Sequence, residues 1–405
     1  MDLFIVFYLA LLAGLGLFLL WQAGLLRSRL SWLLACALLL AAFGGRLAVF
    51  DYETLDYQNF LAHWAAFFRE QGGFSALSRQ VGNYNSPYLY FLALFSYLPV
   101  RDLYLIKALS VSFDLLLAWG VLRLTDRFTG SVVRRFCAFF TTLFLPTVFL
   151  NGALWGQCDS IYAALLLLGI DCALRGRPKL SVVLAALAFG FKLQAVFVLP
   201  LWAVFWIGGK LKTRDLLLFP LTYLLLVLPA VLLGRPFFET ITLYFSQTGS
   251  IGSGLNYNSP SVFAIFWHVE NEKAASVIAI LAAALFTLNM LGVAWIYRRR
   301  LSDQALLALA LLFAIGIPFL LPHMHERYFF PADVLALTLA FSFPLLSPAA
   351  LLTQYASLLG YHAYLKMRYL HPMRYGSAAL IVSFALGLIC FLQGLEVKRA
   401  ARRSP

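Results

Sequence analysis

The sequence predicts an all-α, polytopic membrane protein in which residues 1–405 form a single integral membrane domain of about thirteen spans. Hydrophobic residues make up 62% of the chain and charged residues only 12%, and the mean hydropathy is +0.83. Soluble domains carry about twice that share of charge. Many apolar segments also reach the roughly 17–25 residues that a helix needs to cross a bilayer.

The positive charges indicate how the spans are oriented. The net charge of +13 comes from basic residues in short gaps between apolar segments. That placement is the positive-inside pattern of a membrane protein and gives no support to a nucleic-acid partner. The clusters are Arg27/Arg29, Arg123–Arg135, Arg175–Lys179, Lys210–Arg214, Arg298–Arg300 and Lys398–Arg403. We therefore predict a multi-pass protein of the cell inner or plasma membrane with these clusters on the cytoplasmic side.

Taken in order, the apolar segments alternate between the two faces from a non-cytoplasmic N-terminus. Spans at about 4–25 and 30–50 place residues 51–87 outside as a long first loop. A second outer loop is predicted at 234–269, with a re-entrant apolar segment. The other segments are a dipping helix at 87–99, spans at about 103–123 and 136–151, a span ending before Arg175, two short helices meeting at Lys192 within 180–209, and spans at about 215–233, 273–297, 303–321, 328–347, 348–364 and 376–394.

The first outer loop carries the candidate catalytic carboxylate. From residue 57 to 68 its apolar residues recur at helical spacing, which predicts an interfacial helix with Asp56, Asn59 and His63 on its polar face. A carboxylate there can act as a general base towards a hydroxyl. Asp56 fits this role better than Asp51 because of its place on the polar face. The alternative role for Asp56 is a helix N-cap.

Other polar residues gather on the same predicted side and suit a phosphate group. His325 and Arg327 are the best placed, followed by Lys192 and Arg46, because a guanidinium fork matches phosphate oxygens. No metal site is expected, since His323 and His325 point apart on a helix and HExxH is absent. Five cysteines without metal-type spacing agree with this. No Walker loop supports a nucleotide-driven mechanism, and no cofactor is expected.

A five-residue motif, NYNSP, occurs at Asn83–Pro87 and again at Asn256–Pro260. In each copy the Ser-Pro pair can begin a helix, with the serine as N-cap and the proline in the first turn. The motif is either a recurrent turn for re-entering the membrane or a shared element of a binding site. The sequence leaves both interpretations open.

Four ordered stretches, between about residues 46 and 335, carry a family resemblance. They are DYQNFLAHW with GNYNSPYLYFLAL, ALWGQCDSIYAALLLL, FKLQAVFVLPLW, and HMHERYFFPAD. With them the chain resembles the GT-C glycosyltransferases that use polyprenyl-phosphate sugars, in particular bacterial mannosyltransferases related to those of GPI-anchor synthesis. The resemblance implies a GT-C fold, a lipid-linked sugar donor, and a glycan or glycolipid acceptor.

The resemblance also assigns roles to individual residues. It implies Asp56 as the base, with Asp51 as the runner-up, and His325 and Arg327 at the donor phosphate. Asp56, Tyr57, His63 and Trp64 match a pattern of the glucosyltransferases of asparagine-linked glycosylation, and Tyr84–Pro87 matches their tyrosine–proline turn loosely because Asn-Ser intervenes. The implied sugar or acceptor contacts are His63, Trp64, Tyr84, Gln157, Asp159 and Glu326, while Lys192 and Arg46 assist with phosphate.

Two other functions fit the same polar outer cavity. A lipid or glycolipid transporter or flippase would need polar entrances on both faces, and the cytoplasmic side shows mostly basic clusters. A polysaccharide polymerase or ligase of the O-antigen type would differ in using a diphosphate-linked donor. The sequence does not identify the sugar, the acceptor or the anomeric outcome.

Overall fold

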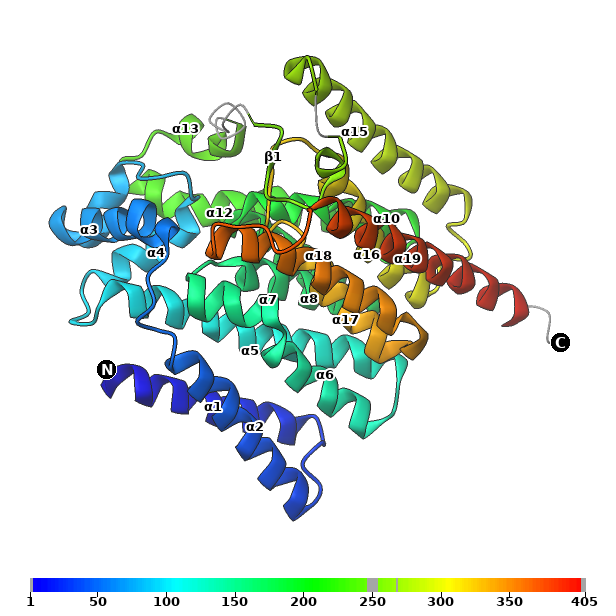
Figure 1. Cartoon of the computed structure of the whole chain (residues 1–405), viewed down its shortest axis with the longest axis horizontal. Helices are drawn as coiled ribbons and strands as arrows, with labels where there is room; N and C mark the ends of the chain where they lie inside the picture. Colours follow the sequence, from blue (N-terminus) through cyan, green and yellow to red (C-terminus); the bar gives the residue numbers. More distant parts are fainter. Residues whose placement is uncertain (1–2, 246–253, 267–268, 402–405) are drawn as a thin grey trace.

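The computed structural model describes residues 3–245, 254–266 and 269–401, and it is mostly helical (Figure 1). The parts of the second predicted outer loop at 246–253 and 267–268, and the side chains of the last basic cluster, lie outside the described residues.

The first half of the chain contains α1 (Leu3–Gln22), α2 (Arg29–Leu47), the π-helix η1 (Tyr57–Leu61), α3 (Ala62–Glu70), the 3₁₀ helix η2 (Gly73–Ser78), α4 (Ser86–Phe95), α5 (Asp102–Phe128), α6 (Val132–Phe144), α7 (Pro146–Phe149), the π-helix η3 (Leu150–Trp155), α8 (Asp159–Leu174), α9 (Pro178–Phe191), the 3₁₀ helix η4 (Leu193–Phe197) and α10 (Pro200–Ile207). The second half contains α11 (Thr213–Leu216), α12 (Leu218–Leu232), α13 (Phe237–Ile241), β1 (Asn256–Tyr257), η5 (Val262–Ala264), α15 (Glu272–Ile296), α16 (Asp303–Leu320), β2 (Met324–His325), α17 (Phe330–Ser342), η6 (Pro344–Leu346), α18 (Ser347–Leu365) and α19 (Arg374–Ala401).

The predicted helical segments are largely present, but the predicted number of spans is not confirmed. Among the described residues, seven helices are long and apolar enough to cross a membrane. The number rises to eight if α6 and the segment Pro146–Trp155, between which the chain bends by 44°, form one span. Four apolar helices are shorter, at Ser86–Phe95, Pro178–Phe191, Leu193–Ile207 and Phe330–Ser342. Each falls short of the roughly 20 residues of a full span. The two short helices expected on either side of Lys192 are among them.

The core of the bundle is built on α5, α8 and α16. In the most apolar 18-residue segment of α5 and of α16, 78% is buried inside the protein, compared with 17% in the corresponding segment of α15. Figure 1 shows the α1–α2 hairpin at one edge of the bundle and α15 at the opposite edge. These outer helices expose large apolar side chains, such as Leu11 and Phe7 on α1 and Leu285 on α15. Such faces suit contact with lipid.

Ion pairs tie three of the predicted cytoplasmic clusters together at one end of the bundle. Asp303, at the start of α16, pairs with Arg127 at 2.7 Å and with Lys210 at 2.9 Å. Arg175, just after α8, pairs with Asp171 at 2.6 Å and reaches the α5 residue Asp126. Helix α8 has 16 residues, so its first residue lies about 24 Å from this end. The polar residues described below gather around that first residue.

The first outer loop contains the predicted helix, as η1 and α3. Leu61, Trp64 and Phe68 are buried, whereas Asn59 and His63 are exposed. Asp56 directly precedes η1, and its side chain makes no capping hydrogen bond. The N-cap alternative for Asp56 is therefore wrong. The location of this helix at a membrane interface stays a prediction.

Candidate functional site

A cavity of about 550 Å³ opens where the first loop, the Lys192 break and the HMHER segment meet. Its lining is rich in amides, phenols and charged groups, mixed with a few apolar side chains. The lining residues are Asp56, Phe60, Leu61, Trp64, Asn83, Tyr84, Asn85, Gln157, Phe191, Lys192, Leu193, Gln194, Tyr244, Tyr257, Asn258, His325, Glu326, Arg327, Tyr328 and Tyr364.

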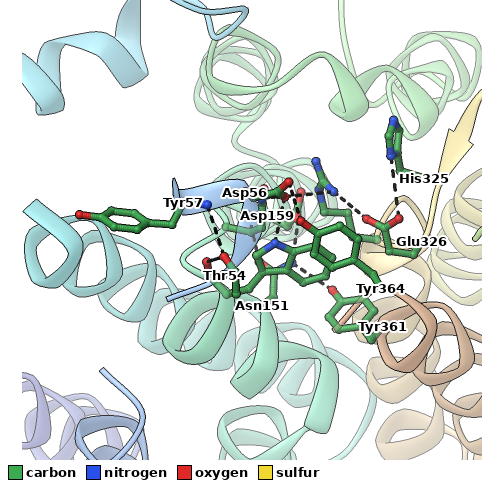
Figure 2. A network of polar contacts seen from close by, with 12 residues as sticks. Thr54, Asp56, Tyr57, Asn151, Asp159, His325, Glu326, Tyr361 and Tyr364 are labelled. Carbon is green, nitrogen blue, oxygen red and sulfur yellow. Dashed lines mark hydrogen bonds and ion pairs between the residues drawn. The ribbon is translucent and has the colours of Figure 1, made fainter. Parts of the chain in front are cut away.

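The carboxylate of Asp56 is held by three hydrogen bonds. The Trp155 indole N–H and the Gln157 amide donate to Oδ2 at 2.9 and 2.8 Å. The Tyr364 hydroxyl donates to Oδ1 at 2.8 Å, and Figure 2 shows Asp56 and Tyr364 in this network. The side chain of Asp56 is still 18% exposed. Asp56 is therefore an oriented carboxylate that remains accessible from the cavity.

Arg327 brings a cation to the same carboxylate. Its Nη1 lies 3.8 Å from Asp56 Oδ2 and 2.7 Å from Glu326 Oε1. Its Nε is buried and has no hydrogen-bond partner among the described residues. A buried N–H without a partner is costly, so this donor is suited to an anionic oxygen of a ligand.

Neighbouring HMHER residues have shifted pKa values. Burial raises the pKa of the Glu326 carboxyl, although the Arg327 guanidinium opposes the rise. Burial, reinforced by the charge of Arg327, lowers the pKa of His325 from 6.5 to about 3. His325 is therefore a neutral imidazole at neutral pH and can offer a hydrogen bond but no positive charge.

Lys192 reaches the cavity from the break between α9 and η4. Its Nζ lies 2.5 Å from Asp159 Oδ1, and Asp159 is fully buried at the start of α8. Asn151, on η3, donates to Asp159 Oδ2 at 2.7 Å and to the Tyr361 hydroxyl at 3.0 Å. Asp159 thus fixes the ammonium group from behind and does not itself line the cavity.

A short parallel pairing joins the second NYNSP copy to HMHER. Strand β1 pairs with β2, with Tyr257 opposite His325. Their rings stack at 4.8 Å. His323 does not line the cavity, and its Nδ1 lies 2.8 Å from Gly254 O, which ties it to the adjacent chain. The pairing places Tyr257 and Asn258 in the cavity wall.

A comparison of the sequence with protein families identifies the family of the chain. Residues 83–322, more than half of the 405 residues, match the model of glycosyltransferase family 87. The chain belongs to glycosyltransferase family 87. It is therefore a glycosyltransferase enzyme, and its several apolar helices indicate a multi-pass integral membrane protein. No curated protein matches the chain. The matched region begins at the first NYNSP copy and ends before HMHER, so Asp56 and Arg327 lie outside it.

The structure brings most of the predicted site residues of this transferase together, but not all. Arg46 is fully buried in an ion pair with Asp114, and Asp51 lies on the surface, 72% exposed. Asp51 accepts hydrogen bonds from Arg101 and Tyr104. His63 is exposed outside the cavity. The predicted residues that line the cavity are Asp56, Trp64, Tyr84, Gln157, Lys192, His325, Glu326 and Arg327.

Four residues of the hydrogen-bond network around Asp56 and Asp159 were not predicted from the sequence. Trp155 lies within the quoted stretch ALWGQCDS, but nothing there sets it apart from the other aromatic residues of the chain. Tyr361 and Tyr364 are three residues apart on α18, within and at the end of a predicted apolar span. Asn151 belongs to a π-helix that periodicity did not reveal. Among the described residues, no group of three His, Cys, Asp or Glu side chains could hold a metal ion.

Proposed function

We propose that this transferase moves a hexose of the mannose or glucose type from a polyprenyl-phosphate donor to a hydroxyl of a glycan or glycolipid on the non-cytoplasmic face. One observation carries the proposal. The Asp56 carboxylate and two cations, Arg327 and Lys192, face one cavity at the opposite end of α8 from the basic ion-pair cluster. By the positive-inside pattern, that end is the non-cytoplasmic one.

Asp56 is suited to the role of general base. Each carboxylate oxygen has two lone-pair sites. On Oδ2 both are used by Trp155 and Gln157, whereas Oδ1 accepts, among the described residues, only from Tyr364. We assign the remaining site on Oδ1 to the acceptor hydroxyl. A positioned base of this kind contributes about 10²–10⁴ in rate.

The cations suit the leaving phosphate. The acceptor oxygen forms a bond to the anomeric carbon, the bond from that carbon to the phosphate oxygen breaks, and the hydroxyl proton passes to Asp56. Arg327 Nε and the ammonium of Lys192 then stabilise the departing polyprenyl phosphate. His325 contributes a hydrogen bond, because its pKa of about 3 keeps it neutral. A direct displacement of this kind inverts the anomeric centre.

The apolar part of the lining suits the lipid. Phe60, Leu61, Phe191 and Leu193 line the cavity beside the charged groups, and Phe60 is 52% exposed. Apolar side chains next to cations let an isoprenoid chain stay in the bilayer while its phosphate is bound.

Two aspartates of the same loop provide the test. We expect Asp56→Asn to lower transfer from a polyprenyl-phosphate hexose by at least about 10²-fold. Asp51→Asn, at a surface site outside the cavity, should retain activity within about twofold. The assay follows radiolabelled hexose into product with purified protein and a membrane lipid extract, offering monophosphate- and diphosphate-linked donors separately. Full activity of Asp56→Asn would remove it as the base, and transfer only from the diphosphate donor would favour a polymerase or ligase.

A further inference from the structure

Trp155 links the two groups on which the proposed reaction depends. Its indole N–H donates to Asp56 Oδ2 at 2.9 Å. The Arg327 guanidinium carbon lies 5.3 Å from the centre of its ring, within the range of a cation–π contact. The ring also stacks on Tyr364, with centroids 4.4 Å apart and planes 11° from parallel. Trp155 thus contacts both the base and the phosphate-binding guanidinium.

Trp155 does not itself reach the cavity. It is fully buried and absent from the cavity lining. Substrate bound in the cavity would contact Asp56, Tyr364 and Arg327, with Trp155 behind them. Any effect of Trp155 on the reaction must therefore act through these neighbours.

The backbone around Trp155 is built to fix the indole. Trp155 is the last residue of η3, and Asp56 directly precedes η1, so two π-helices meet at the hydrogen bond between them. Single-turn π-helices are rare and frequently mark functional sites. Thr54 Oγ1 donates to the Trp155 carbonyl at 3.2 Å, which adds a second tie. Gly156 then turns the chain with φ of +79°, a conformation that favours glycine.

We propose that Trp155 is a positioning residue that fixes the Asp56 carboxylate and the Arg327 guanidinium relative to each other. The inference rests on the proposed function of these two residues. Transfer requires the base and the phosphate-binding group at fixed positions relative to the reacting carbon, and a misplacement of about 1 Å can cost about 10² in rate. The indole holds both by its N–H donor at the ring edge and its large π-face.

The direct test removes the N–H donor. We expect Trp155→Phe to lower kcat by about 10- to 100-fold and to change the KM for donor and acceptor by less than about threefold. β-(3-Benzothienyl)alanine at position 155, which has sulfur in place of the N–H and nearly the same shape, should reproduce this result even if the phenylalanine variant folds poorly.

Trp202 provides the matched control. It is also buried, its N–H donates to Ser181 at 3.0 Å, and it lies outside the cavity. Trp202→Phe should lower thermal stability comparably and leave kcat unchanged.

Each outcome of the test has a distinct meaning. Wild-type kcat in the benzothienyl variant, with Asp56→Asn inactive, would overturn the positioning role alone. Full activity of Asp56→Asn would instead refute the proposed base. A raised KM with unchanged kcat at position 155 would also overturn the inference, because it would indicate contact with substrate.

Discussion

Arg46→Met tests whether this arginine serves folding or phosphate binding. Arg46 donates to Asp114 Oδ2 at 3.0 Å and to the Leu143 carbonyl at 2.8 Å, and both members of the pair are fully buried. Removing one partner of a buried pair costs about 3–5 kcal/mol because the other charge is left uncompensated. For 405 residues the entropy of unfolding is roughly 0.85 kcal/mol/K, so about 4 kcal/mol lowers Tm by about 5 °C.

The same variant should bind donor normally, because Arg46 does not line the cavity. The assay measures Tm in detergent together with the KM for the polyprenyl-phosphate donor. Replacing both partners, Arg46→Met with Asp114→Leu, should restore most of the lost stability. Arg101→Met, which breaks the exposed pairs to Asp51 and Glu53, should cost only about 0–1 kcal/mol. A raised donor KM with unchanged Tm in Arg46→Met would refute this reasoning and restore the predicted phosphate role.

Two further predictions concern HMHER. The pKa of His325 is about 3 in the folded protein and 6.5 ordinarily. Between these two pH values the unfolded chain binds more protons than the folded protein, so stability falls as the pH drops from 6.5 to about 3. When Tm is measured against pH over this range, it should fall less in His325→Asn than in the wild type. Arg327→Lys keeps the charge but loses the partnerless Nε, so the donor KM should rise by about tenfold or more, and an unchanged KM would argue against contact between Nε and phosphate.

The helices were predictable because their signal is local. The span expected at 103–123 is α5, at Asp102–Phe128, and the span expected at 273–297 is α15, at Glu272–Ile296. The number of membrane crossings was less predictable, because it depends on where each helix ends. Lys192 divides one apolar stretch into α9 and η4, and a Leu-Pro step divides α6 from α7, where the chain bends by 44°.

The members of the site were predictable where charge interrupts apolar sequence. Asp56, Lys192 and Arg327 stand out because ionisable residues beside spans are costly and usually functional. Trp155 and Tyr364 do not stand out, since aromatic residues are common in such helices. Their roles depend on the width of the π-helix η3 and on the rotation of α18, and neither leaves a period in the sequence. The strands β1 and β2, of two residues each, are also too short for alternation to show.

The two NYNSP copies separate local structure from function. In the first copy Asn85, and not the predicted serine, is the N-cap of α4, with φ of −75°. The corresponding Asn258 has φ of +56° and no α-helix follows it directly. One motif thus adopts two backbone conformations, which a common re-entry turn would not do. Both copies nevertheless place an asparagine and a tyrosine in the wall of the same cavity. What they share is amide and phenol chemistry directed at one ligand space, and this favours the shared role in binding.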